Sequence, residues 1–166
     1  ALSNAFFLPT KRLLDDIKRL PERGGSAKLL LNGTDAAEKG FRLVAKRARK
    51  DYRFLLQGDK ARDNLKIFEW HGDASKGVSS IHHKVWAFVD AAKDPYAIGS
   101  SNLDFHSLRR NSEGVLLIQD AKTKREMDQA LRGDFAAPGV ERIRKEQLPG
   151  RVKIFLQGIF PPRSWL

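Results

Sequence analysis

Two basic side chains, His82 and Lys84, stand in an otherwise apolar run and could act together on a phosphate. The run at residues 81–89 predicts a β-strand. Successive side chains of a strand point to opposite faces, so His82 and Lys84 should share a face while His83 points away. Imidazole titrates near neutral pH and can serve as nucleophile or general acid, and a lysine ammonium neutralises phosphate oxygens. The pair therefore indicates phosphate chemistry that needs no metal ion.

A second group of polar residues follows in a loop that could return beside this strand. Gly99 gives a tight turn without a side chain, and Ser100 and Asn102 offer a hydroxyl and an amide that can donate hydrogen bonds to an anion. The acidic Glu113 comes shortly afterwards, before another apolar run. Alone, a His-x-Lys pair is most often an ordinary strand surface, and Gly-Ser-x-Asn a generic turn. Their occurrence together and in order indicates a site.

These residues need a scaffold, and the hydrophobic pattern predicts alternating helices and strands. Thr10 is placed to cap an amphipathic helix that runs to about Leu20 and is ended by Pro21. Residues 34–56 lack proline and repeat their apolar side chains at helical spacing, which predicts one long or two consecutive helices. Strands are expected at residues 27–31, 65–70, 81–89 and 114–119, and further helices at 122–131 and 138–147. This alternation predicts an α/β domain with helices flanking a sheet.

The composition is that of a basic globular chain. Its 166 residues suit one domain, and 31 Lys and Arg against 20 Asp and Glu give a formal net charge of +11. Such a charge favours a polyanionic partner: nucleic acid, an anionic membrane surface or a phosphorylated substrate. The absence of cysteine excludes disulfides, thiolate nucleophiles and cysteine-based zinc sites. No apolar run approaches the roughly 18 to 20 residues of a membrane-spanning helix, so any membrane contact should be peripheral or lie in another part of the protein.

Two basic segments could contact phosphates or lipid headgroups. One is a face of the expected helix 34–56, for which a solvated surface is the simpler interpretation; it carries Arg42, Lys46, Arg47, Arg49, Lys50 and Arg53. The other, residues 149–166, mixes aromatic and basic side chains, as segments at a membrane interface do. A tail packed on the domain or on a partner would explain that composition equally well.

The order and approximate spacing of His82-x-Lys84, Gly99-Ser100-x-Asn102 and Asn111-Ser112-Glu113 resemble the phospholipase D superfamily, or HKD family. Residues 99–113 are most similar to the second half of bacterial cardiolipin synthases, and residues 6–10 with the basic helix after them resemble the same group. The resemblance covers about residues 5–120. It implies a phospholipase D-like α/β domain with a mixed central sheet. Residues 1–148 would form one half of a two-domain or dimeric pseudo-twofold assembly, lacking the first strand, with residues 149–166 as a tail.

The resemblance also implies roles for the matching residues. His82 would face a second histidine across the twofold interface; one histidine attacks phosphorus to form a phosphohistidine and the other protonates the leaving alcohol. In a second half His82 would be the general acid and later the base, whereas in a homodimer either copy could attack. Glu113 would accept a hydrogen bond from an imidazole. The expected catalytic residues are His82, Lys84, Asp90, Ser100, Asn102 and Glu113, and the expected substrate-binding residues are Gly99 and His106, with no metal and no cofactor.

One spacing departs from the family pattern. Five residues separate Lys84 from Asp90, where four are usual, and the loop from Asp90 to Gly99 is longer as well. A small turn insertion around residues 91–95 explains both differences and leaves the strand with His82 unchanged. Asp94 could take the place of Asp90.

These features predict a phospholipase D-type phosphodiesterase or phosphatidyltransferase that acts on anionic phospholipid. Its partner would be a second HKD domain, in the same protein or in a homodimer copy. Association with a membrane would be peripheral, at a bacterial inner membrane or on the secreted or periplasmic side. A nuclease of the same superfamily is the alternative, since the charge also suits DNA or RNA. A degenerate scaffold that binds lipid or protein is a third hypothesis, against which the intact motif residues argue. The acceptor alcohol is left open.

Overall fold

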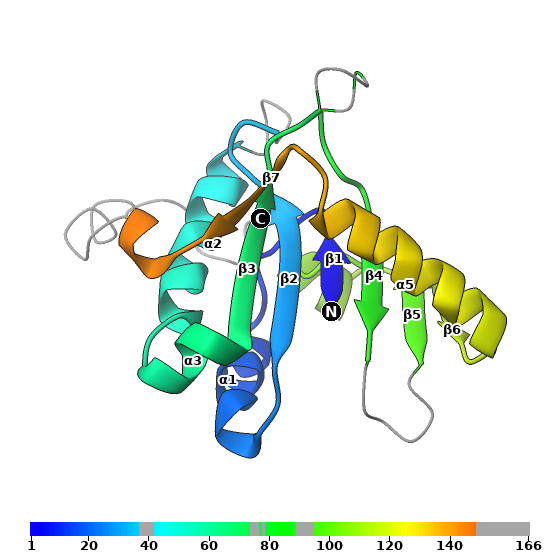
Figure 1. Cartoon of the computed structure of the whole chain (residues 1–166), viewed down its shortest axis with the longest axis horizontal. Coiled ribbons are helices and arrows are strands. Elements are labelled where there is room, and N and C mark those ends of the chain that lie inside the picture. The colour runs from blue at the N-terminus through cyan, green and yellow to red at the C-terminus, as the bar shows by residue number, and fades with distance from the viewer. Residues whose placement is uncertain (37–41, 74–76, 78, 89–94, 149–166) are drawn as a thin grey trace.

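The computed structural model describes residues 1–36, 42–73, 77, 79–88 and 95–148 (Figure 1). In this part of the chain a mixed sheet has the strand order β6-β5-β4-β1-β2-β3-β7. β1 runs parallel to β2 and β2 parallel to β3, and the remaining pairs are antiparallel. The strands are β1 (Leu2–Asn4), β2 (Ala27–Asn32), β3 (Leu65–Trp70), β4 (Lys84–Ala87), β5 (Tyr96–Gly99), β6 (Val115–Ile118) and β7 (Val140–Ile143).

Helices cover the two faces of the sheet unequally. α1 and α2 lie behind the sheet in Figure 1, whereas α5 crosses in front of it. The helices are α1 (Lys11–Arg19), α2 (Arg42–Leu55), α3 (Asp59–Asn64), α4 (Phe105–Arg109) and α5 (Ala121–Phe135), with short 3₁₀ helices η1 (Pro21–Arg23) and η4 (Lys145–Gln147). None of these helices is long and apolar enough to cross a membrane.

The main hydrophobic core fills the space between the sheet and α1 and α2. Leu31 and Ile67 contribute from the strands, Leu14 from α1, and Tyr52 and Leu55 from α2. On the opposite face two smaller apolar clusters form, one over β2 and β3 and one over β4 and β5. Burial of these side chains supplies the main driving force for folding. It also holds β1 and β4 rigidly side by side at the centre of the sheet.

The sequence predicted several elements correctly. Thr10 caps α1, its hydroxyl accepting a hydrogen bond from the Leu13 amide at 3.4 Å. β2 and β3 occupy the predicted positions, and α5 extends the helix predicted at residues 122–131. The central α/β arrangement is confirmed.

Three predicted elements need correction. Residues 138–147 do not form a helix, because Val140–Ile143 pairs with the edge of β3 and only Lys145–Gln147 turns as a 3₁₀ helix. Residues 34–36 form a turn, and within the described residues α2 begins at Arg42. The strand predicted at residues 81–89 is shorter, because its partner β1 ends at Asn4, which pairs with Lys84.

Candidate active site

His82 and Lys84 come together where the chain enters β4. The Lys84 Nζ lies 3.1 Å from each ring nitrogen of His82 and 3.1 Å from the His82 carbonyl oxygen. The prediction that they share a face is confirmed. His83 points to the other face, where its Nδ1 lies 3.3 Å from the Ser3 hydroxyl and 3.4 Å from the Asp134 carboxylate. The site therefore presents a lysine ammonium beside an exposed imidazole.

The electrostatics of Lys84 favour an incoming anion. The side chain is buried, and this burial lowers the pKa of Lys84, while the more distant carboxylates of Glu113 and Asp104 act in the opposite direction. Within the described residues no carboxylate forms an ion pair with Lys84. A buried ammonium without a bonded counter-ion gains from an adjacent phosphate.

The loop after β5 is held to the segment before β6 by a compact set of hydrogen bonds. The Ser100 hydroxyl donates to Glu113 Oε2 at 2.5 Å and accepts from the Gly114 amide at 3.1 Å. The Asn111 side-chain amide donates to the other oxygen of Glu113 at 3.3 Å. The hydrogen bond from Ser100 is the largest cause that lowers the pKa of Glu113, with smaller help from Ser107, Asn111 and Lys84. Glu113 is therefore held as a carboxylate.

Among the described residues the Glu113 carboxylate contacts Ser100 and Asn111 and no histidine. The expected hydrogen bond from an imidazole to Glu113 stays a prediction. The contact with Ser100 orients that hydroxyl.

Gly99 and Asn102 complete the loop. A Cβ atom on Gly99 would lie 2.3 Å from the Gly114 carbonyl oxygen, so close pairing of the chain at the end of β5 requires glycine. The side-chain oxygen of Asn102 is buried and has no hydrogen-bond partner among the described residues. Such an orphaned acceptor is costly unless a donor reaches it.

The remaining predicted site residues lie farther out or outside the described part of the chain. His106 is on α4, where its ring packs edge-on against Phe105 at a centroid distance of 5.9 Å. Asp90 and its substitute Asp94 lie outside the described residues.

Two buried asparagines that the sequence reasoning missed hold the site together. Asn4 Oδ1 accepts from the Leu103 amide at 3.2 Å, and its Nδ2 donates to the Ser101 carbonyl at 3.3 Å. Asn32 Nδ2 donates to the Ile81 carbonyl at 2.9 Å, and its Oδ1 accepts from the Ile81 amide at 2.9 Å. Asn4 thus fixes the loop with Ser100 and Asn102, and Asn32 fixes the residue before His82. The available signal was an asparagine at the end of each of two short apolar segments.

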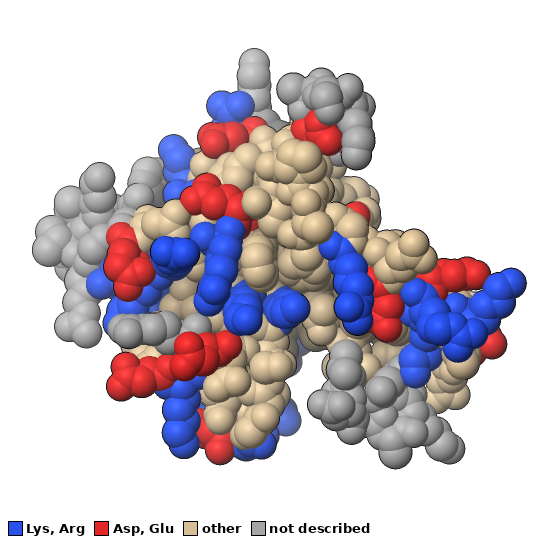
Figure 2. Space-filling view, in the orientation of Figure 1, with Lys and Arg blue, Asp and Glu red and all other residues tan. Residues whose placement is uncertain are grey.

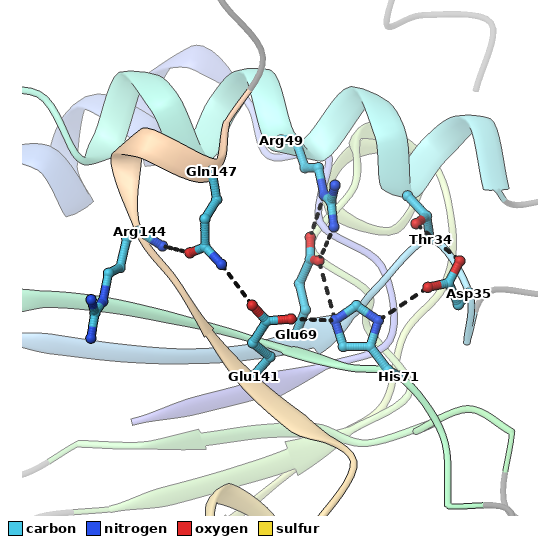
Figure 3. Close-up of polar contacts among 8 residues, drawn as sticks. All are labelled: Thr34, Asp35, Arg49, Glu69, His71, Glu141, Arg144 and Gln147. Carbon is cyan, nitrogen blue, oxygen red and sulfur yellow. Dashed lines mark hydrogen bonds and ion pairs between the residues drawn. The ribbon is translucent and has the colours of Figure 1, made fainter.

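A second polar cluster lies farther along the sheet, on the cross-strand row that carries Lys84 and Asn4 (Figure 3). Glu69 is fully buried and accepts two hydrogen bonds from the Arg49 guanidinium, at 3.0 and 2.5 Å. His71 lies among three carboxylates, 3.7 Å from Glu69, 3.7 Å from Glu141 and 3.5 Å from Asp35. These contacts tie α2, β3 and β7 together.

This cluster also uses part of the basic face predicted on α2. Arg49 forms an ion pair with Glu69, and the Arg53 guanidinium lies 3.5 Å from the Leu148 carbonyl oxygen. No group of acidic, histidine or cysteine side chains in the described residues is arranged to hold a metal ion.

A mixed α/β sheet with His82 and Lys84 at the start of a central strand, and a Ser100–Glu113 pair beside it, defines a phospholipase D-like domain. The chain belongs to the family described as "Cardiolipin synthase, PLD-like domain", whose model matches residues 2–135. The resemblance drawn from the sequence motifs is thereby confirmed.

Comparison with curated sequences and solved structures agrees with this assignment. The chain is 29% identical over 150 residues to cardiolipin synthase B of Escherichia coli (strain K12) and of Salmonella typhi. The alignment covers 90% of this chain but 32% of each relative, so the chain spans about a third of their length.

Similar solved structures have the same fold at low sequence identity. They include phosphatidylserine synthase from Haemophilus influenzae Rd KW20, with a TM-score of 0.67 and 15% identity over 90% of this chain and 35% of that one. They also include the phospholipase D family member Nuc from Salmonella typhimurium, with a TM-score of 0.55 and 12% identity over 86% of this chain and 80% of that one.

Proposed function

We propose that this chain forms half of a phospholipase D-type active site that transfers or hydrolyses phosphatidyl groups. The observation that carries the proposal is the contact of the Lys84 ammonium with His82 at the start of β4, beside the loop fixed by Ser100 and Glu113. The printed names of its relatives, cardiolipin synthase and phosphatidylserine synthase, support a phospholipid substrate.

In the first proposed step a histidine nitrogen bonds to phosphorus as the bond from phosphorus to the leaving alcohol breaks. A second histidine gives its proton to the departing oxygen. In the second step the oxygen of water or of an acceptor alcohol bonds to phosphorus, the P–N bond breaks, and the hydroxyl proton passes to the second histidine. His82 supplies one of the two imidazoles, and a second HKD domain, in the same protein or in another copy, supplies the other.

In this scheme the other motif residues bind the phosphoryl oxygens or position the loop that binds them. Lys84 neutralises their charge, and the gain is large because its side chain is already withdrawn from water. The amide of Asn102 donates to a phosphoryl oxygen. Ser100, held by Glu113, keeps the loop at the distance that the phosphate requires. We keep Asp90 as a candidate supporting residue.

Peripheral contact with an anionic membrane is part of the proposal. Figure 2 shows Lys and Arg in a band across the face that carries β2, β3 and α5. On this face Lys28 of β2 is paired directly with Lys66 of β3, and among the described residues neither has a carboxylate partner. Adjacent like charges repel unless an anion lies over them, and each cation near an anionic surface contributes about 1 kcal/mol.

The proposal is tested by incubating the protein with vesicles of labelled anionic phospholipid and, separately, with labelled DNA and RNA. We expect lipid turnover, and loss of at least about a hundredfold in rate with His82→Asn or Lys84→Met while the circular dichroism spectrum is unchanged. Lys60→Met, at an exposed position on α3, is the matched control and should retain turnover. Cleavage of nucleic acid without lipid turnover would replace the proposal with the nuclease alternative. Vesicle binding without turnover of either substrate would favour the scaffold.

A further inference from the structure

His71 lies in the polar cluster of Figure 3, and carboxylates face both nitrogens of its ring. Its Nε2 lies 3.7 Å from Glu69 and 3.7 Å from Glu141, and its Nδ1 lies 3.5 Å from Asp35. The Nε2 atom is buried and makes no hydrogen bond among the described residues. The imidazole therefore stands between carboxylates from three segments: β3, β7 and the turn after β2.

The three carboxylates differ in their freedom to move. Glu69 is fully buried and is fixed by two hydrogen bonds from the Arg49 guanidinium of α2. The side chains of Asp35 and Glu141 are 78% and 54% exposed. An exposed carboxylate exchanges an ion pair for water at little cost. The contact of Nε2 with Glu69 is therefore the fixed one, and the contact between Nδ1 and Asp35 is the one that can open.

The charge of the ring decides whether the contact with Asp35 holds. An imidazolium has a proton on both nitrogens, so it can donate to Asp35 and Glu69 together. A neutral imidazole has one proton, which belongs on Nε2 because a lone pair there would face the fixed charge of Glu69. Nδ1 then presents a lone pair to Asp35, and the contact is lost. Imidazole changes its charge between about pH 5 and 8, so this contact closes in acid and opens in base.

The backbone beside Asp35 is packed directly on the histidine ring. A Cβ atom on Gly33 would lie 2.8 Å from Cε1 and 2.9 Å from Nδ1 of His71. The Gly33 amide also donates to the Trp70 carbonyl at 2.8 Å. A change in the contact between His71 and Asp35 is therefore felt at once by the backbone at the end of β2.

Asn32, the last residue of β2, connects this backbone to the catalytic strand. Its buried side chain bonds to the carbonyl and to the amide of Ile81, at 2.9 Å each. Ile81 directly precedes His82, whose ring contacts the Lys84 ammonium. A continuous series of contacts thus leads from the ring of His71 to that of His82.

We propose that His71 is a positioning residue whose protonation holds the turn at residues 33–35 and, through Asn32, the position of His82. The inference rests on the proposed phosphodiester chemistry of His82 and adds the regulation of that site by pH. Loss of the Nδ1 proton releases the turn and loosens the segment that enters β4. Because phosphoryl transfer depends on the orientation of the reacting imidazole, the rate falls as His71 loses its proton.

Nitrogen NMR tests the link without a substrate. It is recorded in His82→Asn, so that titration of that ring does not contribute. We expect the ring of His71 to carry two protons at about pH 5.5 and one, on Nε2, at about pH 8.5. The side-chain amide signals of Asn32 should move with the same midpoint.

Added substitutions show whether this movement comes from His71. It should disappear when His71→Gln or Asp35→Asn is added. Asp59→Asn, which removes an exposed carboxylate on α3, is the matched control and should leave it unchanged. A neutral form of His71 with its proton on Nδ1, or movement of the Asn32 signals that persists in His71→Gln, would overturn the proposal.

A comparison of pH profiles tests the effect on catalysis. The kcat/KM for vesicles of labelled anionic phospholipid is measured for the protein with otherwise unchanged sequence and for His71→Gln. The titrations of His82 and of the second imidazole are common to both proteins and cancel in the ratio of the two values. We expect His71→Gln to be at least about threefold slower at about pH 5.5 and within about 1.5-fold at about pH 8.5. The same ratio at both pH values would leave His71 a structural role only and overturn the proposal.

The two measurements separate failure of this inference from failure of the proposed function. Coupled movement of the Asn32 signals in a protein without lipid turnover would support the link from His71 while refuting the phosphatidyl chemistry. Lipid turnover with a constant ratio of kcat/KM would support the chemistry and refute the link.

Discussion

Asn4 and Lys84 lie directly opposite each other on the antiparallel strands β1 and β4. The amide of Asn4, which is fully buried, also holds Ser101 and Leu103 in the loop that carries Asn102. One side chain therefore connects the strand paired with Lys84 to the loop expected to bind the phosphate. The distance between these two parts of the site depends on it.

Replacing Asn4 by Ala should damage stability and activity together. The variant leaves the Leu103 amide without its acceptor in a buried place, which costs about 1 to 3 kcal/mol for each unsatisfied group. We expect a lower free energy of unfolding in urea and a fall in kcat/KM of at least about tenfold in the folded variant, because the loop is released. Asn64→Ala, which removes a surface hydrogen bond to the Lys60 carbonyl, is the control. Undiminished kcat/KM in folded Asn4→Ala would exclude a positioning role.

Lys84→Met should stabilise the protein while it removes activity. Burial lowers the pKa of Lys84 from its usual 10.5, so the folded protein holds this proton less tightly than the unfolded chain does. The lysine therefore costs stability below its lowered pKa, and the cost is relieved as the pH rises through that value toward 10.5. We expect the variant to have the higher free energy of unfolding at pH 7, with a gap that closes toward alkaline pH. Urea denaturation across this range measures the gap, and a gap independent of pH would contradict the argument.

Ser100→Ala should change the titration of Glu113. The hydroxyl of Ser100 is the main cause that lowers the pKa of this carboxyl, so its removal should raise the pKa toward the usual 4.5. The stability that the lowered pKa contributes is present above about 4.5 and is lost as the pH falls through the folded value. A ¹³C NMR titration of the Glu113 carboxyl measures the shift. Asn111→Ala should produce a smaller rise, and an equal or larger one would assign the main contact to Asn111.

The buried ion pair between Arg49 and Glu69 should matter to stability more than the outer carboxylates do. Glu69→Gln leaves the guanidinium without its charged partner, and breaking a buried pair costs about 3 kcal/mol. Glu141→Gln, at a side chain 54% exposed, should change the free energy of unfolding by less than about 0.5 kcal/mol. Chemical denaturation of both variants compares them. Equal losses would mean that the cluster acts through His71 and not through Arg49.

Local chemistry was predictable because it depends on short spacings. His82 and Lys84 share a face because they are two residues apart in an extended segment. The cap at Thr10 and the strands β2 and β3 follow from patterns of a few residues. Each of these features is decided within one element or between neighbouring elements.

The sequence by itself thus determined the family and the mixed α/β class, and it proposed the residues expected to carry the chemistry. Only the tertiary structure decided that residues 140–143 join the sheet, because that choice depends on the open edge of β3 and not on their own pattern. The same holds for Asn4 and Asn32, whose amides bond to segments 49 to 99 residues away. Hydrogen bonds between distant segments arise only when the packed core fixes those segments side by side, and no local pattern in the chain records that arrangement.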